Sequence, residues 1–98
     1  MKLTKHDRHV EELYCGLKDK YEYLAMNIPL TNSKRRKIGE IDLLGVHGDW
    51  IDIYEVKTSY RIHKAKKQLF KLKKNLGEGN YRFYFYCGSS KQLVQMET

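Results

Sequence analysis

The sequence predicts one α/β domain in which helices flank a mixed central sheet. Three observations lead to this fold class. Two segments carry apolar residues at the spacing of an amphipathic helix, and four carry strand-forming residues bounded by polar turns. One helical segment separates two of the strands, and a strand–helix–strand crossover joins parallel strands. At 98 residues the chain has room for one domain, residues 1–98.

The first helix is expected from Thr4 to about Lys20. Thr4 suits the N-cap, with Asp7 at the third helical position. Apolar side chains then recur on one face, at Val10, Leu13, Tyr14, Leu17 and Tyr21. This periodicity predicts an amphipathic helix.

Strands are expected in most of the remaining chain, with one more helix between them. Pro29 indicates an edge position or an irregular end for the first strand, because proline cannot donate to a ladder. The aromatic run YRFYFYC is expected inside the sheet. We predict strands over 22–31, 38–46, 50–58 and 81–87, a helix over 59–76, and a short strand or helical turn over 91–96.

Charge is unevenly distributed along the chain. The net charge is +7, and residues 34–37 and 58–80 form two strongly basic blocks around a group of acids within residues 40–55. Basic blocks favour a polyanionic partner, while the acids between them would repel it unless a cation intervened. No run reads as a membrane segment or a signal peptide, so we expect an intracellular, cytoplasmic protein with no membrane partner.

The acids at Asp42 and Glu55 are expected to lie together. Alternation along a strand places Ile51, Ile53, Glu55 and Lys57 on one face, where a carboxylate at the end of an apolar row costs several kcal/mol unless it is paired or metal-bound. A hairpin that turns about residues 47–49 brings Asp42 beside residues 54–56. A bound cation would relieve the repulsion between the two carboxylates.

This arrangement suits Mg²⁺ or Mn²⁺, since both prefer oxygen ligands and keep bound waters. Lys57 could orient such a water or stabilise developing negative charge. A third carboxylate would come from the first helix, where Glu11, beside the apolar stripe, is favoured over Glu12. The alternative is a salt-bridge ladder on a hairpin, but such ladders normally occupy polar faces.

These residues resemble the PD-(D/E)XK nucleases, and most closely the small archaeal and viral Holliday-junction resolvases. The resemblance covers roughly residues 8–87 by the order of elements. It includes a helix with Glu, the run Glu40-Ile41-Asp42, a hairpin, Glu55-Val56-Lys57, and a basic helix with Gln68. Glu40, not proline, stands two residues before Asp42, as in relatives that carry G-E-I-D.

The resemblance implies a restriction-endonuclease-like α-β-β-β-α-β core. It also implies a divalent metal held by Asp42, Glu55 and the Val56 carbonyl, with Lys57, a first-helix Glu and Gln68 at the catalytic site. The reaction implied is hydrolysis of DNA phosphodiesters, with Holliday-junction or other branched DNA as the leading substrate. A homodimer is expected, since a symmetric junction needs two cuts, and the source would be prokaryotic or viral.

The basic blocks are expected to bind the DNA backbone. Helices usually alternate charge signs, so a run of cations without interleaved acids favours a phosphate-facing helix over a merely solvated one. Two other function classes stay open: a catalytically inactive nucleic-acid-binding module of the same fold, and an RNA endonuclease. The predicted DNA contacts are Lys34, Arg35, Arg36, Lys37, Arg61, Lys64, Lys67 and Lys71.

Overall fold

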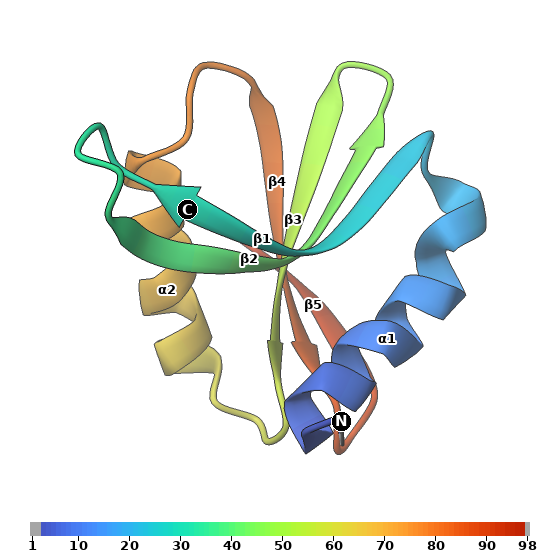
Figure 1. Ribbon diagram of the computed structural model, residues 1–98. Helices are drawn as coiled ribbons and strands as arrows, with labels where there is room; N and C mark the ends of the chain where they lie inside the picture. Colours follow the sequence, from blue (N-terminus) through green and yellow to red (C-terminus); the bar gives the residue numbers. More distant parts are fainter. Residues whose placement is uncertain (1–2, 98) are drawn as a thin grey trace.

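A computed structural model of the chain describes residues 3–97 and shows two helices around a five-stranded sheet (Figure 1). The α/β class and the order of the predicted elements are confirmed. The elements are α1 (Lys5–Leu17), the short 3₁₀ helix η1 (Lys18–Lys20), β1 (Tyr23–Thr31), β2 (Lys37–His47), β3 (Trp50–Lys57), α2 (Ile62–Lys74), β4 (Asn80–Cys87) and β5 (Gln92–Met96).

The sheet is mixed, as predicted, and its strands lie in the order β1-β2-β3-β4-β5. The pair β3–β4 is parallel, and the crossover between these strands is α2. The other three pairs are antiparallel. The proline-containing strand β1 is an edge, the aromatic β4 is interior, and residues 92–96 form the second edge, β5, rather than a helical turn.

The two helices cover opposite faces of the sheet (Figure 1). On one face α1 buries Val10, Leu13 and Leu17 against a cluster that includes Tyr54 and Val56. On the other face Leu69 and Leu72 of α2 pack with Ile41, Ile53 and Phe83. The strand β3 therefore contributes alternate side chains to two separate cores, as its period of two requires.

The first helix begins where its sequence predicts. The Thr4 hydroxyl accepts a hydrogen bond from the Asp7 N–H, and the Asp7 carboxylate accepts one from the Thr4 N–H, which completes a capping box. The regular α-helix ends at Leu17 and is followed by η1, so the predicted end at Lys20 includes one 3₁₀ turn. The capping box fixes the residue at which α1 begins, and this start sets which side chains of the first turn face the sheet.

The second helix begins three residues later than predicted, at Ile62 instead of residue 59. The reason lies in the segment after β3. The carbonyls of Lys57 and Thr58 accept hydrogen bonds from Gly88 and Ser89, which keeps this segment extended beside the turn that follows β4. Among residues 3–97 no helix has both the length and the apolar character needed to cross a membrane.

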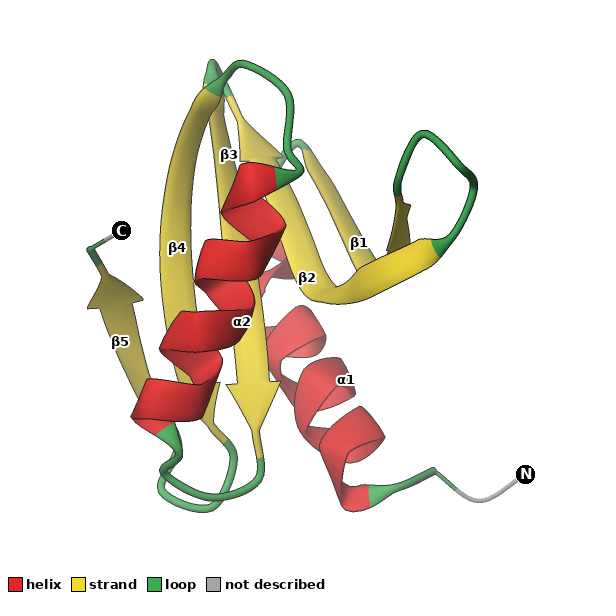
Figure 2. Ribbon diagram, turned by 90° about the vertical axis from the view of Figure 1, so that its left-hand side faces the viewer, coloured by secondary structure: helices red, strands yellow, loops and turns green. Residues whose placement is uncertain are grey.

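Figure 2 shows that strand β2 bends sharply along its length, and the packing of its residues locates the bend at Asp42. Residues two apart on a regular strand share a face, yet Ile41 packs in the α2 core and Leu43 in the α1 core. Opposite the bend, Asn27 of β1 has a left-handed backbone with φ 54°. The ladder between β2 and β3 runs from Leu43 to His47, so β2 departs from β3 at the bend.

Candidate functional site

Asp42 lies at the point where β2 departs from β3. The ladder ends at the pair Leu43–Tyr54, and the Asp42 side chain lies beside Glu55 and Val56, within the predicted range of residues 54–56. The carboxylate Oδ2 of Asp42 accepts a hydrogen bond of 2.9 Å from the Val56 N–H. This bond takes the place of a backbone hydrogen bond from Val56 to β2, which is lost where β2 departs. The Asp42 side chain lies between the two strands with only 5% of its surface exposed.

Glu55 is the second buried carboxyl of the site, with 4% of its surface exposed. Burial raises its pKa to about 8, assisted by the negative charge of Asp42 and by a hydrogen bond to that carboxylate, while Lys57 and His6 oppose the rise. The Lys57 Nζ lies 3.6 Å from the Glu55 Oε1. Two ionised carboxylates here would have Lys57 and, once protonated, His6 as their cationic neighbours.

A small pocket of about 150 Å³ opens beside Glu55. Its wall includes Gln68 and Lys71 of α2, one turn apart, and Glu40 on the departing half of β2. The structure thus brings the predicted Gln68 beside Glu55. The complete lining is Ile38, Gly39, Glu40, Glu55, Gln68, Lys71 and Leu72.

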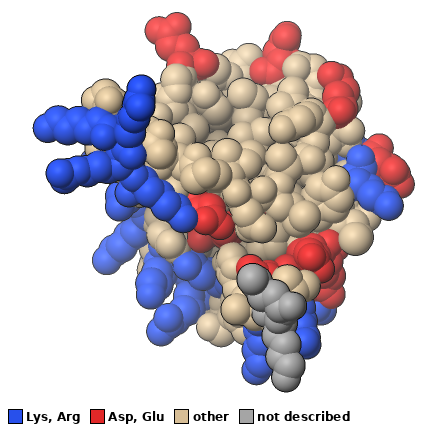
Figure 3. Space-filling view, in the orientation of Figure 1, with Lys and Arg blue, Asp and Glu red and all other residues tan. Residues whose placement is uncertain are grey.

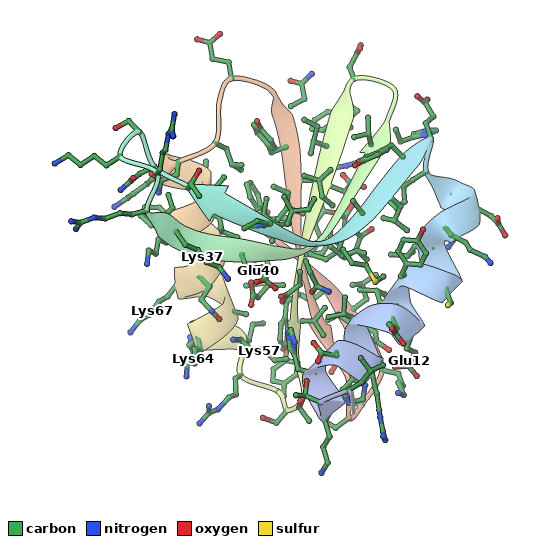
Figure 4. All side chains as sticks on the ribbon, in the orientation of Figure 1. Glu12, Lys37, Glu40, Lys57, Lys64 and Lys67 are labelled. Atoms are coloured by element: carbon green, nitrogen blue, oxygen red, sulfur yellow. The ribbon has the colours of Figure 1, made fainter. Side chains whose placement is uncertain are left out.

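The two predicted basic blocks lie on one side of the molecule. In Figure 3 the Lys and Arg side chains gather over α2 and the turn between β1 and β2. Lys64, Lys67 and Lys71 recur at helical spacing on α2, all exposed, and Lys71 lines the pocket. Figure 4 shows Lys37 and Glu40, an ion pair of 3.0 Å, on the same side of the view as Lys64 and Lys67.

The first helix does not place either predicted glutamate against Asp42 or Glu55. Glu11 is exposed and has no hydrogen bond or ion pair with them in the described part of the chain. Glu12 accepts bonds of 2.5 and 2.7 Å from the Lys91 Nζ and one of 3.2 Å from the Tyr86 hydroxyl. It holds α1 to the end of the sheet, and the role expected of Glu11 stays a prediction.

His6 occupies the position at which a helix glutamate was expected. Its Nε2 lies 3.3 Å from the Asp42 Oδ2, and this contact raises the pKa of the imidazole. No role at the site was predicted for this histidine from the sequence. A signal was present, because His6 precedes Val10 by four residues and therefore extends the buried face of α1 by one turn.

A third buried acid, Asp52, belongs to a different network. Arg82 donates two hydrogen bonds to its carboxylate, of 2.6 and 3.1 Å, and the Tyr21 hydroxyl donates one of 2.6 Å. Tyr21 also bonds to the Tyr54 hydroxyl. Both Asp52 oxygens have partners, so this acid stabilises the sheet, whereas Asp42 and Glu55 would repel each other if both were ionised.

The donor set at Asp42 and Glu55 fits a hard divalent cation by its chemistry. The two buried carboxyls would repel each other if both were ionised, with Lys57 beside Glu55 and His6 beside Asp42, and a divalent cation would let both ionise. Within residues 3–97, no three His, Cys, Asp or Glu side chains stand together in a ready metal-binding arrangement. Binding would therefore require side-chain rotation to close the ligand set.

Comparisons with known proteins assign no family to the chain. No protein-family model matches the sequence, and none of the curated proteins matches it significantly.

Proposed function

We propose that the protein is a metal-dependent endonuclease with a restriction-endonuclease-like core that hydrolyses DNA phosphodiester bonds. The observation that carries this proposal is the buried pair Asp42–Glu55 with Lys57 beside it. A solvated salt-bridge ladder would expose its carboxylates, but these two are 5% and 4% exposed. Groups held in an unfavourable electrostatic state at a pocket are typical of functional sites.

Asp42, Glu55 and the Val56 carbonyl would hold the metal. Bound there, Mg²⁺ or Mn²⁺ would lower the pKa of a coordinated water and act as a Lewis acid toward a phosphate oxygen. The fit rests on the oxygen donors and on the closeness of two buried acids, which a cation would allow to ionise together.

The chain's own side chains would orient the substrate. The Lys57 ammonium, 18% exposed beside Glu55, holds three donor protons and can bond to a phosphate oxygen or to the attacking water. The Gln68 amide lies at the same pocket and can donate to either. Burial of both acids excludes bulk water from their far sides and strengthens these contacts.

The DNA would approach from the side that carries the basic blocks. Residues 34–37 project from the turn beside the departing half of β2, and Lys64, Lys67 and Lys71 follow the pocket along α2. Arg61 stands at the N-cap of the same helix. Contacts of this kind bind phosphates and carry no information about base sequence. They suit a protein that recognises the shape of its DNA, including branched DNA cut by a homodimer.

A cleavage assay tests the proposal. Purified protein is incubated with supercoiled plasmid, linear duplex and a four-way junction, in EDTA, Mg²⁺ or Mn²⁺. We expect cleavage only with metal, a preference for the junction, and loss of cleavage in Asp42→Ala and Lys57→Ala. Asp49→Ala, which removes an exposed acid of the β2–β3 turn, is the matched control and should cleave normally.

The outcomes separate the competing functions. Binding of DNA without cleavage in either metal would refute the nuclease and support an inactive binding module. Cleavage of RNA with no cleavage of DNA would refute the choice of substrate. Equal cleavage by wild type and a folded Asp42→Ala variant would refute the site.

A further inference from the structure

His6 lies among the groups that would hold the metal. Its Nε2 is 3.3 Å from the Asp42 Oδ2, and its ring also interacts with the Glu55 charge. The Val56 N–H donates to the same Asp42 oxygen at 2.9 Å, so His6 and Val56 meet at this carboxylate.

The position of His6 is set by two separate constraints. The capping box of Thr4 and Asp7 fixes the start of α1, and Val10, one turn later, is fully buried against the sheet. The imidazole is therefore held at the gap that β2 leaves when it departs from β3. Its side chain is 38% exposed, so an ion can reach it from solvent.

The distances suit a shared ion. Adjacent ligands on an octahedral cation with bonds of 2.0–2.2 Å stand about 3 Å apart, close to the 3.3 Å between the Nε2 and the Asp42 Oδ2. The other ring nitrogen, Nδ1, lies 4.0 Å from the Asp7 carboxylate. The Asp42 carboxylate is the nearer of the two and favours a proton on Nε2 in the metal-free protein, and a bound cation would take the place of that proton.

We propose that His6 is a metal ligand, so that α1 contributes a nitrogen donor to the site where a glutamate oxygen would be expected. This inference rests on the proposed metal site and deepens it. The ligand set becomes the Asp42 and Glu55 carboxylates, the Val56 carbonyl and the His6 Nε2. A nitrogen donor raises affinity for the later divalent metals, so Mn²⁺ and Co²⁺ should bind more tightly than Mg²⁺.

The test uses Mn²⁺ as its own spectroscopic probe. Mn²⁺ binding to the full chain is measured by electron paramagnetic resonance, and electron spin-echo modulation detects a directly coordinated ¹⁴N. We expect wild type to bind Mn²⁺ with ¹⁴N modulation. His6→Ala should lose the modulation and bind Mn²⁺ at least about tenfold more weakly, since loss even of outer-sphere partners has effects of this size.

Three variants supply the controls. His9→Ala, which removes the next histidine of α1, should retain both the modulation and the affinity. His6→Asp restores a ligand of oxygen type, so it should bind Mn²⁺ without ¹⁴N modulation and bind Mg²⁺ better relative to Mn²⁺ than wild type does. Asp42→Asn should lose Mn²⁺ binding. Circular dichroism confirms that each variant is folded.

The failures are distinguishable. Mn²⁺ that binds through Asp42 but shows no ¹⁴N modulation, or modulation that persists in His6→Ala, would overturn the role of His6 and leave the proposed nuclease intact. Absence of Mn²⁺ binding to wild type would overturn both the ligand and the metal site. Loss of the ¹⁴N modulation in His9→Ala but not in His6→Ala would show that His9 is the nitrogen ligand and would overturn the inference.

Discussion

Replacement of Glu55 by Gln should stabilise the metal-free protein at high pH and have much less effect at low pH. The pKa of Glu55 is about 8 in the folded protein against 4.5 as its ordinary value. Between these values the folded protein holds a proton that the unfolded chain has lost, so wild-type stability falls as the pH rises toward 8. The amide of Gln imitates the protonated carboxyl and removes this dependence.

The size of the effect follows from the same difference. Each unit of pKa difference corresponds to about 1.4 kcal/mol, so wild type should lose about 2–3 kcal/mol relative to Glu55→Gln between pH 6 and pH 9. The free energy of unfolding is measured by urea denaturation in EDTA, followed by far-UV circular dichroism. Comparison with the variant cancels the titration of groups that the two proteins share.

Glu40→Gln is the matched control for this experiment. Glu40 lines the same pocket, but its side chain is 38% exposed and paired with Lys37 at the surface. Its replacement should leave the wild-type pH dependence in place. Parallel pH profiles for wild type and Glu55→Gln would refute the reasoning, because they would mean that Glu55 ionises in the folded protein as easily as in the unfolded chain.

Three further perturbations test other parts of the structure. Asp52→Ala leaves Arg82 and the Tyr21 hydroxyl without their acceptor, so urea denaturation should show a free energy of unfolding lower by roughly 2–4 kcal/mol. Cleavage per folded molecule should be unchanged, and lost cleavage in a folded variant would place Asp52 in the active site. Gly45→Ala brings a Cβ within 2.6 Å of the Tyr21 ring and should lower the free energy of unfolding by about 1–3 kcal/mol. An unchanged Tm would show that the ring moves aside freely. Alanine at all four of residues 34–37 should lower the salt dependence of DNA binding by up to about 0.9 in log–log slope for each phosphate that the variant no longer neutralises, and an unchanged slope would exclude this turn from the DNA interface.

The pairing of Asp42 with Glu55 could be predicted because it depends on local rules. Alternation assigns Glu55 to the face of Ile53, and the turn at residues 47–49 sets the register that brings Asp42 beside it. Both rules operate within one hairpin. The sequence therefore contained enough information for the two acids, for Lys57 beside them, and for Gln68 once the resemblance had singled it out.

The approach of His6 to Asp42 could not be derived with the same certainty. Periodicity could have assigned His6 to the buried face of α1, but the strand residue it meets depends on how the helix packs across the sheet. The same packing set Glu12 against Lys91, far along the chain, and left Glu11 exposed. Helix-to-sheet contacts join residues remote in sequence, and no local period encodes them.

By itself, the sequence determined the α/β class, the order of helices and strands, the capping box that starts α1, and the gathering of charge into basic and acidic segments. These follow from propensity, periodicity and composition, which act over a few neighbouring residues. Only the tertiary structure decided that β2 bends at Asp42, that Val56 donates to its carboxylate, and that Asp52 is bound by Arg82 while Glu55 is buried beside a second acid. The physical reason is that burial and charge compensation are properties of the packed molecule, where each acid meets partners from several strands and helices at once.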